Sequence, residues 1–378
     1  MSDQVTKYPN QSLAARFTVP GWLAVLSGVL GSALGIATNL YSAEFRDALE
    51  QSTNEFNPAV VSSIVAAIVS SAATTIIYRT ISRRRQLSAI APGEIKIQSD
   101  AVSEGMQEED AVVGRTLKFL EAKRSSDDLL VFLHGLGLDA NDFRPYMAES
   151  KFHCIALTMY GFNTDESHDP DYHPISLESH ISVLTYGLEK LRQRNPRKRL
   201  SLVGFSFGAD MALFLAMLAS PRVRELPIAK VVLLDPNLNC ETLTVSREVA
   251  KVDLDRPLAQ LDRILESVST ISDFRDYCEY LYKITGKSFV QVRRYAGDVV
   301  NMWTSPSYNE FLDRLGLLLS IVPDVHIVLS RTNEQHFNAV VRGAANRGLD
   351  VGKIEASKGG HFDLITSNYL KDLLEGVI

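Results

Sequence analysis

Hydrophobic and polar positions follow a regular order through most of the chain, in which short apolar runs alternate with longer segments of helical periodicity. The apolar runs lie at residues 128–134, 154–158, 199–204, 230–235, 325–330 and 352–357. Helices are predicted between them by an amphipathic pattern at 176–194, which Ser176 can cap, and by a mostly apolar pattern at 209–219. Short strands that alternate with helices indicate a parallel sheet covered on both faces. We therefore predict an α/β domain, with a mainly parallel sheet flanked by helices, over residues 110–378.

One interval breaks this alternation. Residues 237–320 contain helical patterns and many aromatic residues, but no convincing strand. An insertion at the carboxyl edge of an α/β sheet lies over the binding crevice. The pattern therefore predicts a helical lid, some of whose aromatic side chains line an apolar acyl pocket.

Two uncharged segments precede the domain, at residues 17–41 and 59–78. Each has the length of about 20 residues that a helix needs to cross the hydrocarbon core. They predict a transmembrane helical hairpin within a membrane anchor at 1–85. A cleaved signal peptide is the alternative, but the first segment is longer than the usual apolar region of a signal peptide. The polar, unpatterned residues 86–109 are predicted to be a linker between anchor and domain.

Charged residues orient this hairpin. Arg79 and the arginines at 83–85 follow the second segment, whereas the loop between the segments has only Arg46 among several acidic residues. Because positive charge favours the cytoplasmic side, both termini are expected in the cytoplasm. Small residues recur along both segments and either pack the two spans together or support a homo-oligomer. These small residues are Ser27, Gly31, Gly35, Ser62, Ala66, Ser70 and Thr74.

Composition and charge narrow the range of functions. Apolar residues make up 46% and charged residues 22% of the chain, as in ordinary folded proteins. A net charge of −6 lacks the basic footprint of a nucleic-acid-binding protein, so no nucleic-acid partner is expected. The cysteines at 154, 240 and 278 have no CxxC spacing, which argues against a disulfide framework or a zinc site.

Two polar clusters have ordinary interpretations. Residues 165–173 include His168 and His173, but they lack a regular metal-ligand spacing, so we expect a solvated loop and no metal. The basic run at 192–199 joins a helix to the next strand at the amino edge of the sheet. It is interpreted as a solvated turn, with contact to anionic lipid as the alternative.

The chemistry centres on Gly204-Phe205-Ser206-Phe207-Gly208, which lies between an apolar run and a helical pattern. In this context GxSxG is a nucleophile elbow, a strained turn that holds the serine Oγ above the sheet. The glycines leave room for the tight turn. A serine needs a base to take its proton, so a histidine and an acid are required elsewhere.

At this motif the chain resembles the α/β-hydrolase superfamily, and the resemblance covers residues 110–378. His134-Gly135-Leu136-Gly137 follows the first apolar run, where the family keeps its oxyanion turn. By this resemblance the N–H groups of Leu136 and Phe207 form the oxyanion hole. His361, in Gly-Gly-His-Phe after the last run, takes the place of the catalytic histidine. The chain departs from the family in lacking recognisable first strands, which predicts a minimal sheet.

The acid has two candidates. Asp235 ends the run after the elbow, where some branches of the family place it. The more common position follows the next run, where Asn333 stands and Glu334 comes one residue late. Chain order and strand-end placement favour Asp235 over Glu334. The alternative for Asp235 is a structural turn before proline.

These features predict a membrane-anchored serine hydrolase that cleaves an ester or thioester. The expected substrate is a lipid or acyl ester, attacked by Ser206 with His361 as base and an acyl-enzyme as intermediate. No cofactor is expected. The alternatives are a catalytically silent hydrolase fold that serves as a membrane-tethered binding or signalling module, and a membrane-disrupting effector.

Overall fold

The computed structural model describes residues 89–101, 112–163, 165–166, 172–253, 263–265, 268 and 270–378. The predicted spans at 17–41 and 59–78 lie outside these residues. Within the described residues, no helix combines the length and apolar character that crossing a membrane requires.

An eight-stranded sheet forms the centre of the described domain, with the order β1-β2-β4-β3-β5-β6-β7-β8. Strands β3 to β8 run parallel, whereas β1 pairs antiparallel with β2, and β2 pairs antiparallel with β4. The strands are β1 (Ile90–Lys96), β2 (Thr116–Ala122), β3 (Asp128–Leu133), β4 (His153–Thr158), β5 (Arg199–Phe205), β6 (Ile228–Leu234), β7 (Val325–Leu329) and β8 (Lys353–Ala356). The six predicted apolar runs are therefore the six parallel strands. Every residue of β4 and of β7 is buried.

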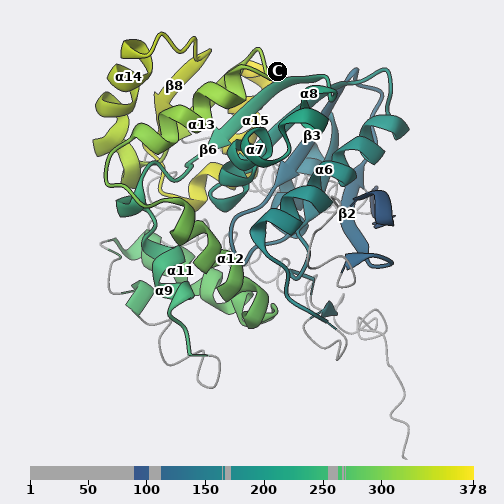
Figure 1. The fold of residues 1–378 in the computed structure, drawn as a ribbon, viewed down its shortest axis with the longest axis horizontal. Helices are drawn as coiled ribbons and strands as arrows, with labels where there is room; N and C mark the ends of the chain where they lie inside the picture. The colour runs from purple at the N-terminus through teal and green to yellow at the C-terminus, as the bar shows by residue number, and fades with distance from the viewer. Residues whose placement is uncertain are drawn as a thin grey trace, which may run out of the picture. The chain divides into compact units, whose positions relative to one another are not determined.

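Helices cover the sheet as predicted (Figure 1). One layer contains α6 (Leu177–Arg194), α7 (Phe207–Leu218) and α13 (Asn309–Leu319), with α7 packed between α6 and α13. The short α8 (Ser220–Arg224) follows α7, and α14 (Phe337–Asn346) packs on α13 and β8. Helices α5 (Arg144–Glu149) and α15 (Ser367–Val377) contact each other in a second layer. Ser176 caps α6 by accepting a hydrogen bond from Ser179 N, as its position predicted.

The expectation of a minimal sheet and of a linker throughout 86–109 is wrong. Strand β1 lies inside the expected linker and pairs along its whole length with β2. Its sequence contains Pro92 and Gly93, which are poor strand residues and argue against a strand in the sequence pattern. An edge strand nevertheless tolerates proline. The ring of Phe119 on β2 covers Gly93, since a Cβ there would lie 2.3 Å from Phe119 Cζ.

Strand β1 begins at the same edge of the sheet as the parallel strands. Ile90 pairs with Ala122, and Ala122 pairs with Cys154 near the beginning of β4. The first described strand therefore begins at the edge of the sheet where the parallel strands begin. The opposite edge, where the parallel strands end, contains the elbow.

The insertion is helical, and no described residue between 237 and 320 belongs to a strand. It contains α9 (Thr244–Ala250), α11 (Ile271–Ile284) and α12 (Phe289–Met302), followed by α13. Figure 1 shows α9, α11 and α12 gathered at one end of the sheet. Three of its aromatic side chains, Tyr295, Trp303 and Phe311, are buried in the core. These three side chains therefore pack in the core, and the expectation that some aromatic residues of the insertion line an acyl pocket falls on the others.

Candidate active site

Ser206 lies between the end of β5 and the start of α7. Its backbone has φ 52° and ψ −119°, a region that non-glycine residues rarely occupy. The turn is held because Ser206 N donates a hydrogen bond of 2.8 Å to Leu234 O on the neighbouring strand. Strain of this kind persists only where the surroundings enforce it, and it marks functional turns. The geometry is that of a nucleophile elbow.

The two glycines of the motif are required by close packing. A Cβ on Gly208 would lie 2.1 Å from Leu133 O, and one on Gly204 would lie 2.5 Å from Gly208 O. Both distances are far below van der Waals contact, so a side chain at either position would push α7 away from the ends of β3 and β5. The glycines therefore bring the first turn of α7 against the sheet.

Asp235 and His361 meet at the carboxyl edge. Asp235 follows β6 directly, has φ 51° and is buried. Its Oδ2 lies 2.6 Å from His361 Nδ1. Burial alone would raise the pKa of Asp235, but the hydrogen bond and charge of His361, together with hydrogen bonding from Ser330, hold that pKa below its ordinary value. The carboxylate is therefore ionised at neutral pH.

The second carboxylate oxygen of Asp235 is also bound. Oδ1 accepts hydrogen bonds from Ser330 N at 2.8 Å and from Asn333 Nδ2 at 2.9 Å. Asn333 thus occupies the position after β7 and donates to the carboxylate that lies after β6. Glu334, in the 3₁₀ helix η6 (Arg331–His336), is exposed, and the bond to His361 is made by Asp235 instead.

The His361 ring lies beside the elbow. It packs against Phe205, the residue before Ser206, with ring centroids 4.6 Å apart, and against Phe362 at 5.1 Å. Among the described residues, no hydrogen bond joins Ser206 Oγ to His361. Such bonds are often long in a free enzyme and shorten when substrate binds.

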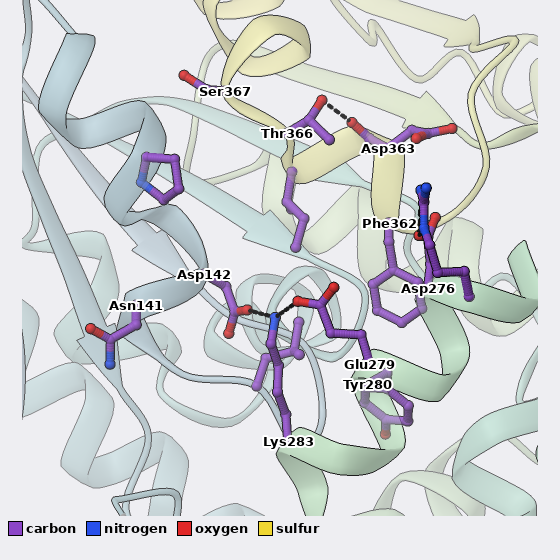
Figure 2. Close-up of a pocket in the computed structure, with 14 residues that line it drawn as sticks. Asn141, Asp142, Asp276, Glu279, Tyr280, Lys283, Phe362, Asp363, Thr366 and Ser367 are labelled. Atoms are coloured by element: carbon purple, nitrogen blue, oxygen red, sulfur yellow. Dashed lines mark hydrogen bonds and ion pairs between the residues drawn. The ribbon is translucent and has the colours of Figure 1, made fainter. Parts of the chain in front are cut away.

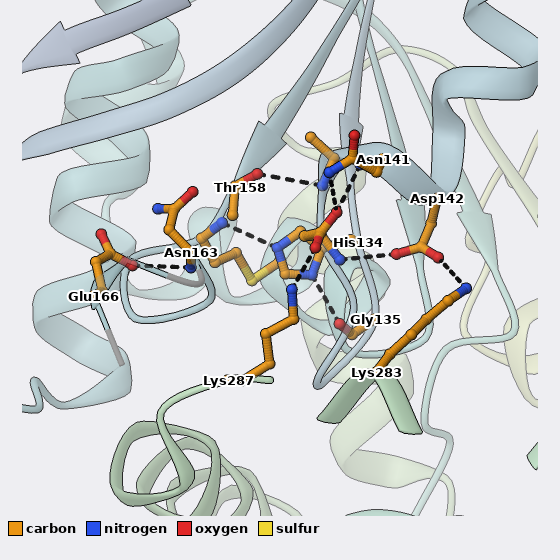
Figure 3. A network of polar contacts seen from close by, with 12 residues as sticks. His134, Gly135, Asn141, Asp142, Thr158, Asn163, Glu166, Lys283 and Lys287 are labelled. Carbon is orange, nitrogen blue, oxygen red and sulfur yellow. Dashed lines mark hydrogen bonds and ion pairs between the residues drawn. The ribbon is translucent and has the colours of Figure 1, made fainter. Parts of the chain in front are cut away.

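His134 anchors the turn that contains Leu136 (Figure 3). Its Nε2 accepts a hydrogen bond of 3.0 Å from Met159 N, so the ring proton is on Nδ1, which donates to Gly135 O at 2.8 Å. Burial lowers the pKa of His134 to about 4, and the ring is therefore neutral at pH 7. A neutral imidazole is what this pair of bonds needs, because one nitrogen must accept.

The N–H groups of Leu136 and Phe207 are available to a ligand. Within the described part of the chain, neither group donates a hydrogen bond to a protein acceptor. Phe207 N is at the first position of α7, where helix N–H groups have no intrahelical partner. Two such donors near the elbow are what an oxyanion hole requires.

Asp210 is a residue that the sequence analysis did not identify. It lies on α7, is fully buried, and accepts hydrogen bonds from Asn237 N at 3.1 Å and from the Asn237 side chain. Burial raises the pKa of Asp210 to about 7. The signal in the sequence is a single acidic residue within an apolar helix. Asp210 holds the loop that begins at Asp235 against the helix that begins after Ser206.

A cavity of about 310 Å³ opens next to Phe362 (Figure 2). It lies between α11, the 3₁₀ helix η3 (Ala140–Phe143) and the 3₁₀ helix η7 (Phe362–Ile365). Its lining is mixed, since Lys283 bridges Asp142 at 2.7 Å and Glu279 at 3.0 Å within it. The cavity therefore differs from the apolar acyl pocket that was expected. The lining residues are Leu138, Asn141, Asp142, Pro145, Arg275, Asp276, Glu279, Tyr280, Lys283, Phe362, Asp363, Ile365, Thr366 and Ser367.

The described residues contain no group of three or more His, Cys, Asp or Glu side chains that could hold a metal ion. His168 of the polar cluster at 165–173 lies outside them.

A strained serine between strand and helix, with an acid and a histidine bonded at the same edge of a mainly parallel sheet, defines an α/β hydrolase. The family model described as alpha/beta hydrolase fold matches residues 128–322, just over half of the chain. The chain belongs to this family.

Solved structures share the fold at low sequence identity. A bacterial membrane phospholipase A, described as a virulence factor, is 13% identical with a TM-score of 0.50, over 84% of this chain and 96% of that one. An AqdC variant, in complex with the Pseudomonas quinolone signal whose ring it cleaves, is 16% identical with a TM-score of 0.50, over 76% of this chain and 100% of that one. No curated protein sequence matches the chain.

Proposed function

We propose that the chain is a serine hydrolase that cleaves an ester or thioester through Ser206, His361 and Asp235. The observation that carries this proposal is the bond between buried Asp235 and His361 Nδ1 beside the elbow at Ser206. A fold alone does not justify assigning an activity. A serine, a histidine and an aspartate that lie together at the carboxyl edge of the sheet do support one.

The proposed reaction follows from the protonation of each group. Ionised Asp235 accepts from Nδ1–H of His361 and leaves Nε2 free to take the proton of Ser206. Ser206 Oγ then attacks the carbonyl carbon, and the N–H groups of Leu136 and Phe207 stabilise the oxyanion. His361 returns the proton to the leaving group, which leaves an acyl-enzyme. Water, activated by the same histidine, hydrolyses it. No cofactor enters any step.

We expect active-site labelling to test this proposal directly. A fluorophosphonate probe incubated with the native protein should phosphonylate Ser206, because an activated serine attacks phosphorus as it attacks a carbonyl. Mass spectrometry of the digested protein locates the label, and heat-denatured protein is the control. A folded protein that stays unlabelled would favour the silent fold, in which the domain binds or signals without catalysis.

The substrate class and the location belong to the same proposal. The uncharged segments at 17–41 and 59–78 support a membrane anchor with two spans and both termini in the cytoplasm. A lipid or acyl ester is the substrate that such an anchor favours. The membrane-disrupting effector differs in one respect, because its activity would require the N-terminal spans.

Topology is predicted from the flanking charges. A reporter fused after Ile378 that is active only in the cytoplasm should be active, because the arginines after residue 78 are retained on that side. The matched fusion carries a reporter that is active only outside the cytoplasm and should be silent. The reverse pair of results would contradict the predicted orientation.

A further inference from the structure

Two lysines at the corner between α11 and α12 reach the segment that follows the oxyanion turn (Figure 3). Lys287 Nζ is bonded to Asp139 Oδ2, and Lys283 Nζ lies 2.7 Å from Asp142 Oδ1. The Lys287 side chain is only 5% exposed and that of Asp139 is 23% exposed. A pair this far from solvent is little screened, and removing one partner leaves the other charge without compensation.

Both acids also hold η3 in shape. Asp139 Oδ1 accepts a hydrogen bond of 2.8 Å from Asn141 N, and Asp142 Oδ2 accepts one of 2.9 Å from Asp139 N. This reciprocal arrangement is a capping box, which fixes the first turn of a helix. Each carboxylate therefore binds backbone with one oxygen and a lysine of the insertion with the other.

Helix α11 touches the oxyanion turn itself. Gly137, the residue after Leu136, has φ +79°, and a Cβ there would lie 2.9 Å from Ile284 Cγ1 and 3.3 Å from a ring carbon of Tyr280. Both α11 side chains are buried. The insertion thus packs directly on the backbone next to the Leu136 N–H.

The sheet holds the opposite side of the same segment. Thr158 Oγ1 accepts a hydrogen bond of 3.2 Å from Ala140 N, and His134 Nε2 accepts from Met159 N. The turn between β3 and η3 therefore lies between β4 on one side and α11 on the other. Of these two sides, only the one that faces the α11–α12 corner is held by ion pairs.

We propose that the α11–α12 corner holds the oxyanion turn in its working position, with Lys287 and Lys283 as positioning residues for the Leu136 N–H. The ion pairs act through Asp139 and Asp142, and neither lysine touches the reacting atoms. This inference rests on the proposed hydrolase function. It assigns the insertion a part in transition-state stabilisation, in addition to any part in choosing substrate.

The test compares Lys287→Met with Lys251→Met in the full chain. Lys251 is a matched control, because it also makes an ion pair on the insertion, with Glu248, but is exposed. We expect Lys287→Met to lower kcat by about 10- to 100-fold, less than the roughly 10²–10³-fold loss of a whole donor. KM should change by less than about threefold, because the lost interaction is made in the transition state. Lys251→Met should match the native protein.

A boronic acid inhibitor separates positioning from general damage to the fold. It forms a tetrahedral adduct on Ser206, so its inhibition constant should rise in Lys287→Met in proportion to the loss of kcat/KM. Lys287→Arg, which keeps the charge, should restore most of both. A folded Lys287→Met protein with unchanged kcat, or with unchanged boronic acid affinity, would overturn the inference.

Two further results complete the test. If Lys287→Met does not fold, Lys283→Met provides the same comparison at a more exposed pair, where the side chain is 37% exposed. A native protein that neither hydrolyses esters nor reacts with fluorophosphonate refutes the proposed function itself. A native protein that is active while both lysine variants keep native kcat refutes only the role of the corner.

Discussion

Replacing Ser206 with alanine is expected to abolish ester hydrolysis while the protein stays folded. The Ser206 side chain is partly exposed at the elbow, and the backbone bond from its N–H to Leu234 O does not depend on the hydroxyl. Without Oγ no acyl-enzyme can form. Loss of the nucleophile in a comparable triad lowers kcat on the order of 10⁶-fold. Turnover of p-nitrophenyl esters measures the effect, and thermal unfolding checks the fold.

A matched control removes a hydroxyl elsewhere. Ser320, at the end of α13, is exposed, and its hydroxyl donates to Leu317 O of that helix. Ser320→Ala should therefore retain native turnover. A folded Ser206→Ala protein with native turnover would refute the serine mechanism, and the observed activity would then need another nucleophile.

Asp235→Asn is expected to lower kcat by about 10⁴-fold, the cost of the corresponding change in a serine protease. The physical reason is control of the tautomer. The carboxylate accepts from His361 Nδ1–H, whereas an amide can donate to Nδ1 and place the ring proton on Nε2, where it blocks the base. The asparagine variant keeps the size of the side chain, so kcat on p-nitrophenyl esters reports the tautomer more than the packing.

Glu334→Gln is the matched control for the acid. Glu334 is exposed on η6, and its replacement should leave kcat within about twofold, as for most surface substitutions. The reverse result, with Glu334→Gln inactive and Asp235→Asn active, would move the acid to the position after β7. If both variants keep native kcat, the hydrolase works without either carboxylate.

The parallel strands and the elbow could be predicted because their signals are local. Strands β3 to β7 are mostly buried on both faces, and each therefore appears in the sequence as a short apolar run. The elbow carries its glycines at the two positions where backbone atoms approach within 2.5 Å of a Cβ. The sequence pattern therefore contains the reason for the turn.

Strand β1 could not be predicted because it is stabilised by its pairing with β2 and not by its own sequence pattern. Pro92 and Gly93 are poor strand residues, and they are tolerated at the sheet edge because Phe119 of β2 covers the glycine. Gly93 and Phe119 belong to separate segments of the chain, and antiparallel pairing of the two strands brings them together. The local pattern of hydrophobic residues does not predict a pairing between two separate segments.

The contacts of the candidate acid and of the insertion join residues that are far apart in the sequence. Asp235 and Glu334 both follow strands, but it is the Asp235 carboxylate that Ser330 N and Asn333 Nδ2 bind and that lies 2.6 Å from His361 Nδ1. Lys287 is separated from Asp139 by 148 residues. Single charges such as these look like ordinary surface residues in the sequence.

Strand β1 begins at the edge of the sheet opposite the elbow. Ile90 lies at the edge where the parallel strands begin, and Ser206 lies where β5 ends, so the length of a strand separates the two edges, about 20 Å for seven residues. A spectroscopic label attached at the exposed residue Ala89 would therefore lie at the edge opposite the elbow.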